Sequence, residues 1–454
     1  MKMSSSNAAA KPVSEAEMNI SQAGLVDSCF EEDQYDAGIS VLDQLRSPWR
    51  RPKASHIRQL LYMALYPPSF QIREVDVTAS PSKIKQGVTF RLTTTAIRSA
   101  QRLLLSFALT NTPKGLFRTI PGYDEEVPST EGDDDSVVAR DSQCITRSKN
   151  CWSLLKPGFI KCSTSAPQSN GSKRRRSQHD EEDGSVVSEN AWSTLEWFIT
   201  IFEKDESMAE VGQSPYSELL LSQIPPTRDG KGRWELNTPL DVVFCCLQQR
   251  NEHYRKLGVR LMTLLINLSL TIYLDYPIFV SSVFSRLSTT SADLFVYLML
   301  SLAPSSSMLR FKVSLCQHFL RNHDGHVSDL PTRPKPQARP PPRVRGSNAT
   351  TVPVAEKPTT AASVQPVTRK IALPSAKEIV RLASLKATSS SVSIPRIQLE
   401  LVQAYTLLQL QCAEEERDQD WLAGVYRDKL KSAFADACEE GREFGEVLQT
   451  LVDT

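Results

Sequence analysis

The stretch NTPLDVVFCCLQQRNEHYRKLGVRLMTLLINLSLTIYLDYPIFVSSVFSRLSTTSADLFVYLMLSLAPSSSMLRFKVSLCQHFL, residues Asn237–Leu320, decides the fold. Its apolar residues recur at helical intervals, and short turns that contain Pro or Ser divide it into five segments. Several segments are apolar almost all round, which is typical of helices covered on two sides. The pattern predicts helices that begin at Thr238-Pro239 and continue at Tyr254–Tyr273, Ile278–Leu287, Ala292–Ala303 and Ser307–Phe319. These five helices indicate an all-α fold class with an irregular, HEAT-like helical-repeat scaffold, although no fixed repeat period is visible.

Helical periodicity extends upstream of this stretch. Residues 192–204 carry aromatic and aliphatic side chains at three- and four-residue intervals, with Ser188 or Asn190 as the expected N-cap. Nearer the N-terminus, the same reasoning predicts helices at Ile39–Leu45, from Ser55 as N-cap to Leu65, and at Thr93–Leu109, with a short strand at Ile72–Val77.

Further helices are expected towards the C-terminus. The segment LPSAKEIVRLASL predicts a short helix, and Ile397–Leu410 predicts another. The last predicted helix carries apolar residues at four-residue steps: Leu422, Tyr426, Leu430, Phe434 and Cys438. Such a drifting stripe favours packing against the parent domain over a long coiled-coil seam. We therefore expect this tail to fold back on the core or to cover a partner.

Charged, Ser-rich and Pro-rich segments interrupt the helices. They lack the apolar residues whose burial would offset the entropy lost on ordering, so long disordered inserts are predicted. The expected organisation is a disordered arm at 1–36, N-terminal scaffold helices at 37–122, an acidic and basic disordered insert at 123–187, a helical core at 188–326, a Pro-rich linker at 327–374 and C-terminal helices at 375–454. Within the insert, the segment CWSLLKPGFI is expected to dock on the main body.

Overall charge and targeting signals exclude some function classes. Lys and Arg together number 53 against 52 Asp and Glu, so no overall field attracts nucleic acid or anionic lipid. No apolar segment follows Met1, so we expect an intracellular protein without a secretory signal. The apolar run Leu261–Leu274 is shorter than the roughly 20 residues that span a bilayer, which favours a buried core helix. The nine cysteines are scattered and are expected to be structural thiols in a reducing compartment.

Motifs for catalysis or metal binding do not stand out. The chain contains no P-loop, dinucleotide-binding, nucleophile-elbow, HExxH or CxxC pattern. Zinc at Cys144, Cys151 and Cys162 with His179 is a minor alternative, because a CxxC pair is missing. The cluster His318, His323 and His326 fits the C-terminal end of a helix better than a metal site. No catalytic residue, metal or cofactor is predicted, although a site built from distant residues stays open as an alternative.

Two short motifs are candidates for recognition by other proteins. The cluster Lys173, Arg174, Arg175, Arg176 is a candidate nuclear localisation signal, or a solvated linker charge run whose field the following acids Asp180–Asp183 cancel. The segment PTRPKPQARPPPRVRG offers candidate partner motifs for an SH3 or WW groove, formed by Pro331, Pro334, Pro336, Pro340, Pro341 and Pro342.

Four helical segments together resemble a known family. They read SHIRQLLYMALYPPSFQIREVDV, then TAIRSAQRLLLSFAL, then NTPLDVVFCCLQQRNEHYRKLGVRLMTLLINLSL, and finally FVYLMLSLAPSSSMLRFKVSLCQHFL. Their order is similar to that of the CANIN domain, the coiled-coil SMC and NSE interacting domain of Nse-six-type subunits and localisation factors of the Smc five/six complex. The resemblance covers roughly residues 42–320 and carries no diagnostic residue.

The resemblance implies a nuclear, non-enzymatic, HEAT-like subunit. Such a subunit would pair with a second helical subunit and help load a chromosome-organising ATPase at damaged DNA. Exposed apolar residues on the Asn237–Leu320 helices are the expected partner groove, because contiguous apolar surface marks interfaces. Direct contact with nucleic acid is left open, and no membrane partner is expected. Two alternatives are a cytoplasmic helical adaptor that uses its Pro-rich linker and an unrecognised all-α enzyme.

Overall fold

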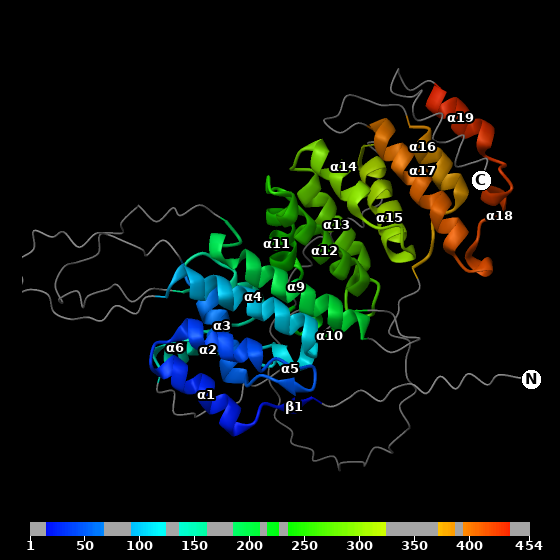
Figure 1. Ribbon diagram of the computed structural model, residues 1–454. Helices are drawn as coiled ribbons and strands as arrows, with labels where there is room; N and C mark the ends of the chain where they lie inside the picture. The colour runs from blue at the N-terminus through cyan, green and yellow to red at the C-terminus, as the bar shows by residue number, and fades with distance from the viewer. Residues whose placement is uncertain are drawn as a thin grey trace, which may run out of the picture. The chain divides into compact units, whose positions relative to one another are not determined.

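The protein has an all-α fold, as predicted. The computed structural model describes residues 15–67, 92–123, 136–160, 185–208, 216–226, 235–323, 371–385 and 394–435. Figure 1 shows these residues mostly as helices. The described ranges also contain two strands of two residues each. The chain divides into two compact units, Met1–Met308 and Leu309–Thr454. A HEAT-like repeat stays a prediction.

The first unit begins with a small parallel strand pair and a group of helices. Strands β1 (Ala16–Glu17) and β2 (Arg50–Arg51) pair Ala16 with Arg50 and Glu17 with Arg51. The helices are α1 (Ile20–Glu31), α2 (Tyr35–Gln44), α3 (Ala54–Ala64), α4 (Thr94–Thr110) and α5 (Pro113–Phe117). Helix α1 packs on α2, and α3 packs on α4. The predicted strand at Ile72–Val77 lies outside the described residues.

Helix α1 corrects the prediction of a disordered arm at residues 1–36. Its Val26 and Phe30 are buried, and the Phe30 ring lies against Gly38 of α2. A Cβ atom at Gly38 would come within 2.5 Å of that ring, so the missing side chain lets the two helices approach. A few well-spaced apolar residues therefore order a segment that is otherwise polar. Residues 1–14 lie outside the described part.

Three short helices lie within the predicted disordered insert at 123–187, and the first two of them correct that prediction. They are α6 (Val137–Asp141), α7 (Gln143–Thr146) and α8 (Cys151–Leu154). Trp152 is buried and donates from its indole Nε1 to the Gln223 carbonyl at 2.9 Å, and the Cys151 amide donates to Gln223 Oε1 at 2.7 Å. The expected docking of the CWSLLKPGFI segment is thus confirmed. Residues 124–135 and 161–184 lie outside the description.

The central helices follow the predicted order, except that α10 lies where no helix was predicted. They are the short η3 (Glu189–Ala191), α9 (Trp192–Ser207), α10 (Glu218–Ser222), α11 (Asn237–Leu247), α12 (Glu252–Ser269), α13 (Tyr276–Leu287), α14 (Ala292–Ser301) and α15 (Ser306–His323). Helix α12 packs against α11 and α9, and α9 also packs against α4. Within the described ranges, no helix combines the length and apolarity that crossing a bilayer requires.

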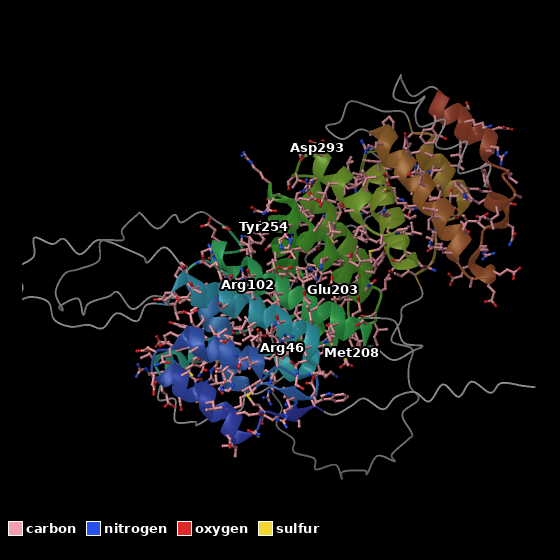
Figure 2. The ribbon with its side chains drawn as sticks, viewed as in Figure 1. Arg46, Arg102, Glu203, Met208, Tyr254 and Asp293 are labelled. Atoms are coloured by element: carbon pink, nitrogen blue, oxygen red, sulfur yellow. The ribbon has the colours of Figure 1, made fainter. Side chains whose placement is uncertain are left out.

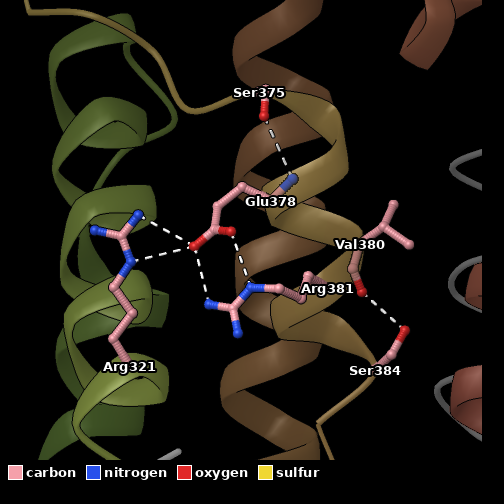
Figure 3. A network of polar contacts seen from close by, with 6 residues as sticks. All are labelled: Arg321, Ser375, Glu378, Val380, Arg381 and Ser384. Carbon is pink, nitrogen blue, oxygen red and sulfur yellow. Dashed lines mark hydrogen bonds and ion pairs between the residues drawn. The ribbon is translucent and has the colours of Figure 1, made fainter. Parts of the chain in front are cut away.

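The second unit consists of the larger part of α15 and the helices that follow it. These are α16 (Ala376–Ala383), α17 (Ile394–Gln411), η4 (Glu414–Glu416), α18 (Gln419–Leu422) and α19 (Arg427–Ala435). Helix α16 packs on α17 and α19. Figure 3 shows Glu378 of α16 between two guanidinium groups, accepting from Arg321 Nη2 at 3.2 Å and from Arg381 Nε at 3.0 Å. This network joins α15 to α16.

The prediction of the last helix is wrong in one respect. Helices α18 and α19 are separate, because Gly424 lies between them with a φ of +71°, a left-handed conformation that ends a helix. Tyr426, Leu430 and Phe434 are buried, whereas Leu422 is exposed. The four-residue stripe thus begins at Tyr426, and its last predicted member, Cys438, lies outside the described residues.

Candidate functional site

Both recognition motifs predicted from the sequence lie outside the part of the chain that the structure describes. The first is the basic cluster Lys173–Arg176, and the second is the proline series Pro331–Pro342. Their roles in nuclear import and partner recruitment therefore stay predictions.

Histidines and cysteines form no metal site in the described ranges. No three His, Cys, Asp or Glu side chains converge there as metal ligands would. His318 is half-buried on α15, where burial and then Arg321 lower its pKa. The seven described cysteines are free thiols, and burial raises the pKa of Cys144 to about 11. His179, His326 and Cys162 lie outside the description.

The helices of Asn237–Leu320 expose few large apolar side chains. These are Ile272 after α12, Ile278 on α13 and Leu300 on α14. Most other apolar residues of the stretch are buried, because neighbouring helices cover them. The predicted partner groove therefore reduces to separate exposed positions, of which Leu300 at 66% and Ile278 at 50% exposure are the most accessible.

A connected set of polar contacts lies at the C-terminal end of α9, where Figure 2 labels Glu203 and Met208. We call Glu203, Lys204, Asp205 and Glu206 the α9 hub. Glu203 binds Arg260 of α12 through both carboxylate oxygens, at 2.8 and 2.5 Å. Asp205 accepts from the Ser217 hydroxyl at 2.7 Å and from the Leu219 amide at 3.0 Å, and so fixes the start of α10.

Lys204 of the α9 hub ties α9 to the end of α4. Its Nζ donates to the carbonyl oxygens of Ala108 and Leu109, both at 3.0 Å, and to that of Asn111 at 2.7 Å. Carbonyls at a helix C-terminus lack partners within the helix and carry partial negative charge, so a cation is favourable there. Burial lowers the pKa of Lys204, while the Glu15 carboxylate opposes this change.

Burial also opposes the ionisation of Glu206, another member of the α9 hub. Burial raises the pKa of its carboxyl group to about 7, opposed by a hydrogen bond from Asn267 and reinforced by Glu203 and Asp205. Asn267 Nδ2 donates to Glu206 Oε1 at 3.0 Å. Glu206 therefore changes its protonation state near neutral pH while it joins α9 to α12.

Aromatic stacking joins the other end of the same two helices. The rings of Trp192 on α9 and Tyr254 on α12 stack with centroids 4.1 Å apart. The next residue, Arg255, places its guanidinium 3.4 Å from the ring centroid of Tyr297 on α14. Because Trp192 meets Tyr254 and Glu206 meets Asn267, α9 and α12 run in the same direction. Contacts at both ends of the pair thus fix its register.

A second buried polar contact lies between α1 and α3. The fully buried His56 ring pairs through Nε2 with Asp27 Oδ1 at 2.8 Å, and its Nδ1 has no partner within the described residues. Burial opposes ionisation of Asp27, yet His56 and Lys53 hold the pKa of its carboxyl group below the usual value. This pair stabilises the packing of α1, the helix that composition alone did not predict.

In the second unit, ionisable groups are buried between α15 and α17. Lys312 and Cys316 are one helical turn apart on α15, and both are buried. Burial lowers the pKa of Lys312 and raises that of Glu400 on α17, while each group partly offsets the other's shift. Lys312 and Glu400 thus attract each other between α15 and α17.

These constellations connect helices to one another. Sequence reasoning missed all of them, and the only visible signal was the alternation of charges in the EKDE segment at 203–206. In comparisons with known proteins, no family model, no curated protein and no solved structure matches this chain.

Proposed function

We propose that the chain is a non-enzymatic helical scaffold or regulatory subunit. In this proposal it binds a second helical subunit and helps recruit or load the Smc five/six chromosome complex during DNA repair in the nucleus. The observation that carries the scaffold role is the α9 hub, whose four consecutive charged residues all join α9 to α4, α10 or α12. Charged residues that hold helices in register are expected in a protein whose function is to present binding surfaces to other proteins. The choice of complex rests on the CANIN resemblance.

The proposed partner surface includes the exposed apolar positions of α13 and α14. Ile278 and Leu300 belong to the Asn237–Leu320 helices, where the partner groove is expected, and partner binding would remove their apolar surface from water. Leu109 of α4 provides a matched control, since it is also an exposed leucine, at 75%, but lies outside the Asn237–Leu320 stretch.

Affinity purification from nuclear extract, with mass spectrometry of the bound proteins, tests this proposal. We expect the tagged full chain to recover the Smc five/six core together with a helical partner. The double variant Ile278→Asp/Leu300→Asp should lose the helical partner, because a buried unpaired charge costs several kcal/mol at an interface, whereas Leu109→Asp should retain it. If an intact nuclear bait enriches none of these subunits, the assignment to the complex is wrong.

The Pro-rich segment motivates a second candidate, a cytoplasmic adaptor for SH3 or WW proteins. Its six prolines, interspersed with Arg and Lys, have the composition that such grooves bind. Deletion of residues 331–342 separates the candidates. An adaptor would lose its partners, whereas the scaffold would keep the chromosome-complex subunits.

A further inference from the structure

The turn between α17 and α18 carries an excess of negative charge. Glu414, Glu415, Glu416, Asp418 and Asp420 lie within seven residues that contain one cation, Arg417. All of these acids except Asp418 are exposed. One of them is neutralised by another helix, since Arg310 Nη2 of α15 binds Glu416 Oε2 at 2.6 Å. Glu414, Glu415 and Asp420 are exposed to solvent, whereas Asp418 is half-buried.

Apolar side chains adjoin this acidic turn. Trp421 is partly exposed and packs edge-on against the buried Tyr405 ring, with centroids 4.8 Å apart. Leu422 and Val425 follow it with exposures of 39% and 61%. We call residues Glu414–Val425 the aromatic–acidic face. A rigid indole beside carboxylates is a surface that binds basic, proline-rich peptides.

The residues that support this face already hold one end of the chain segment that joins α15 to α16. Tyr405 donates from its hydroxyl to the Pro374 carbonyl at 3.0 Å, and Asp418 Oδ2 accepts from the Ala376 amide at 3.0 Å. Arg310 Nη1 also donates to the Ile371 carbonyl at 3.0 Å. The linker therefore ends against the face.

A buried amide beneath the turn has unused hydrogen-bonding capacity. Gln409 Oε1 accepts from the Asp418 amide at 2.7 Å, whereas its Nε2 has no acceptor within the described residues. Buried donors are normally satisfied, so this one points to an acceptor that the described residues do not supply. A backbone carbonyl of an occupant that repacks the turn would satisfy it.

The same linker carries the complementary chemistry. Residues 331–345 contain five cations, Arg333, Lys335, Arg339, Arg343 and Arg345, with six prolines and no acid. Prolines favour the extended polyproline II conformation, which loses little entropy on binding and exposes its carbonyl oxygens.

Chain length allows the segment to reach the face. Arg310, which binds Glu416, lies 13 residues before the end of α15 at His323, or about 20 Å along the helix axis. The eight residues from His323 to Pro331 span at most about 26 Å when extended. They are therefore long enough to return Pro331 to the level of Arg310.

We propose that the aromatic–acidic face binds the chain's own basic, Pro-rich segment 331–345. The carboxylates of the turn pair with the cations of the segment, and Trp421 packs against its prolines. This contact withholds the proline motifs from outside proteins until a competitor for the face or the segment releases them. The inference does not depend on the Smc five/six assignment.

A peptide of residues 329–347, labelled with a fluorophore, tests the contact by fluorescence anisotropy against full-length chains. In one chain, residues 331–345 are replaced by fifteen Gly and Ser residues, which leaves the face vacant. We expect this chain to bind the peptide at least about tenfold more tightly than the unaltered chain, whose own segment competes at high effective concentration. Equal affinities, or no binding to the replaced chain, would overturn the proposal.

Two further variants of the replaced chain identify the surface. Glu414→Gln/Glu415→Gln/Asp420→Asn changes exposed residues only and should weaken peptide binding at least about tenfold by removing the charge attraction. Glu31→Gln/Glu32→Gln, two exposed acids at the end of α1, should leave it unchanged. The proposal is wrong if the triple variant binds normally or if both variants bind equally weakly.

The role of proline and the identity of the occupant need separate readouts. A peptide with its six prolines changed to Ala should bind several-fold more weakly, and unchanged binding would reduce the contact to charge alone and overturn the polyproline interpretation. Sedimentation of the unaltered chain should show a monomer across the concentrations used. A dimer that dissociates when 331–345 is replaced would instead assign the segment to a second copy of the chain.

Discussion

Glu206 carries a carboxyl group whose ionisation the fold opposes. Burial raises its pKa from a usual value near 4.5 to about 7, and the nearby Glu203 and Asp205 act in the same direction. In the unfolded chain the group releases its proton near pH 4.5. Between these values the folded state binds more protons, so stability is fully present below about pH 4.5 and falls as the pH rises through 7.

The variant Glu206→Gln should remove this loss. A glutamine can still accept from Asn267 through Oε1 but carries no charge at any pH. We expect the variant to match the unaltered chain at pH 4.5 and to be more stable at pH 8 by about 1–3 kcal/mol, the energy of a pKa shift of this size after a discount for partial exposure. Urea unfolding at both pH values measures the difference. Glu203→Gln should act oppositely at pH 8, because it removes the ion pair with Arg260.

At the scale of elements, a glycine lets α11 and α12 pack closely together. A Cβ atom at Gly258 of α12 would lie 2.9 Å from Cys246 Cβ and 3.1 Å from the Val243 carbonyl oxygen. Neither neighbour is the end of a flexible side chain, so a methyl group there must separate the helices. The glycine thus sets the distance between α11 and α12.

Gly258→Ala should therefore destabilise the protein by about 1–3 kcal/mol, the usual cost of overpacking. Gly24→Ala on α1 is the matched control, since a Cβ atom there meets nothing within 4 Å. Alanine's higher helix propensity should stabilise that helix by about 0.5–1 kcal/mol. Opposite shifts of the urea midpoint would confirm the packing argument, and a stabilised Gly258→Ala would contradict it.

The helices that sequence reasoning predicted well share one property. Helix α9 and helices α11 to α17 carry dense apolar periodicity, so burial and local pattern agree. The prediction errors occur where a single residue determines where a helix begins or ends. Ser55 lies inside α3, whose N-cap is Lys53, and Gly424 divides the predicted last helix. Helices α1 and α6–α8 depend on a few residues whose partners are distant in sequence.

The α9 hub was not predictable for a related reason. The EKDE segment has the composition of a solvated helix end, and only the folded chain brings Arg260, Asn267 and the α4 carbonyls to it. The aromatic–acidic face likewise combines an ordinary acidic turn with Tyr405, which precedes it by several residues and orients Trp421. Contacts of this kind depend on tertiary packing, which periodicity does not encode.

At the scale of the whole molecule, the chain comprises two units with separate buried cores. Leu265 of α12 belongs to the first core and Leu401 of α17 to the second, and both are fully buried. Truncating such a residue to Ala costs about 2–5 kcal/mol. If each unit unfolds as its own cooperative transition, that cost appears only in the unit that contains the cavity.

Hydrogen exchange followed by mass spectrometry distinguishes one cooperative unit from two. Leu265→Ala should accelerate exchange in α9, α11 and α12 by about 30-fold or more, the factor that corresponds to at least 2 kcal/mol, and should leave α16 and α17 unchanged. Leu401→Ala should produce the reverse pattern. Acceleration of both sets by either variant would mean that one transition unfolds the whole chain. If the two units unfold independently, the second unit could release the Pro-rich segment while the α9 hub of the first unit stays intact. A binding switch in the second unit would then not require the first unit to unfold.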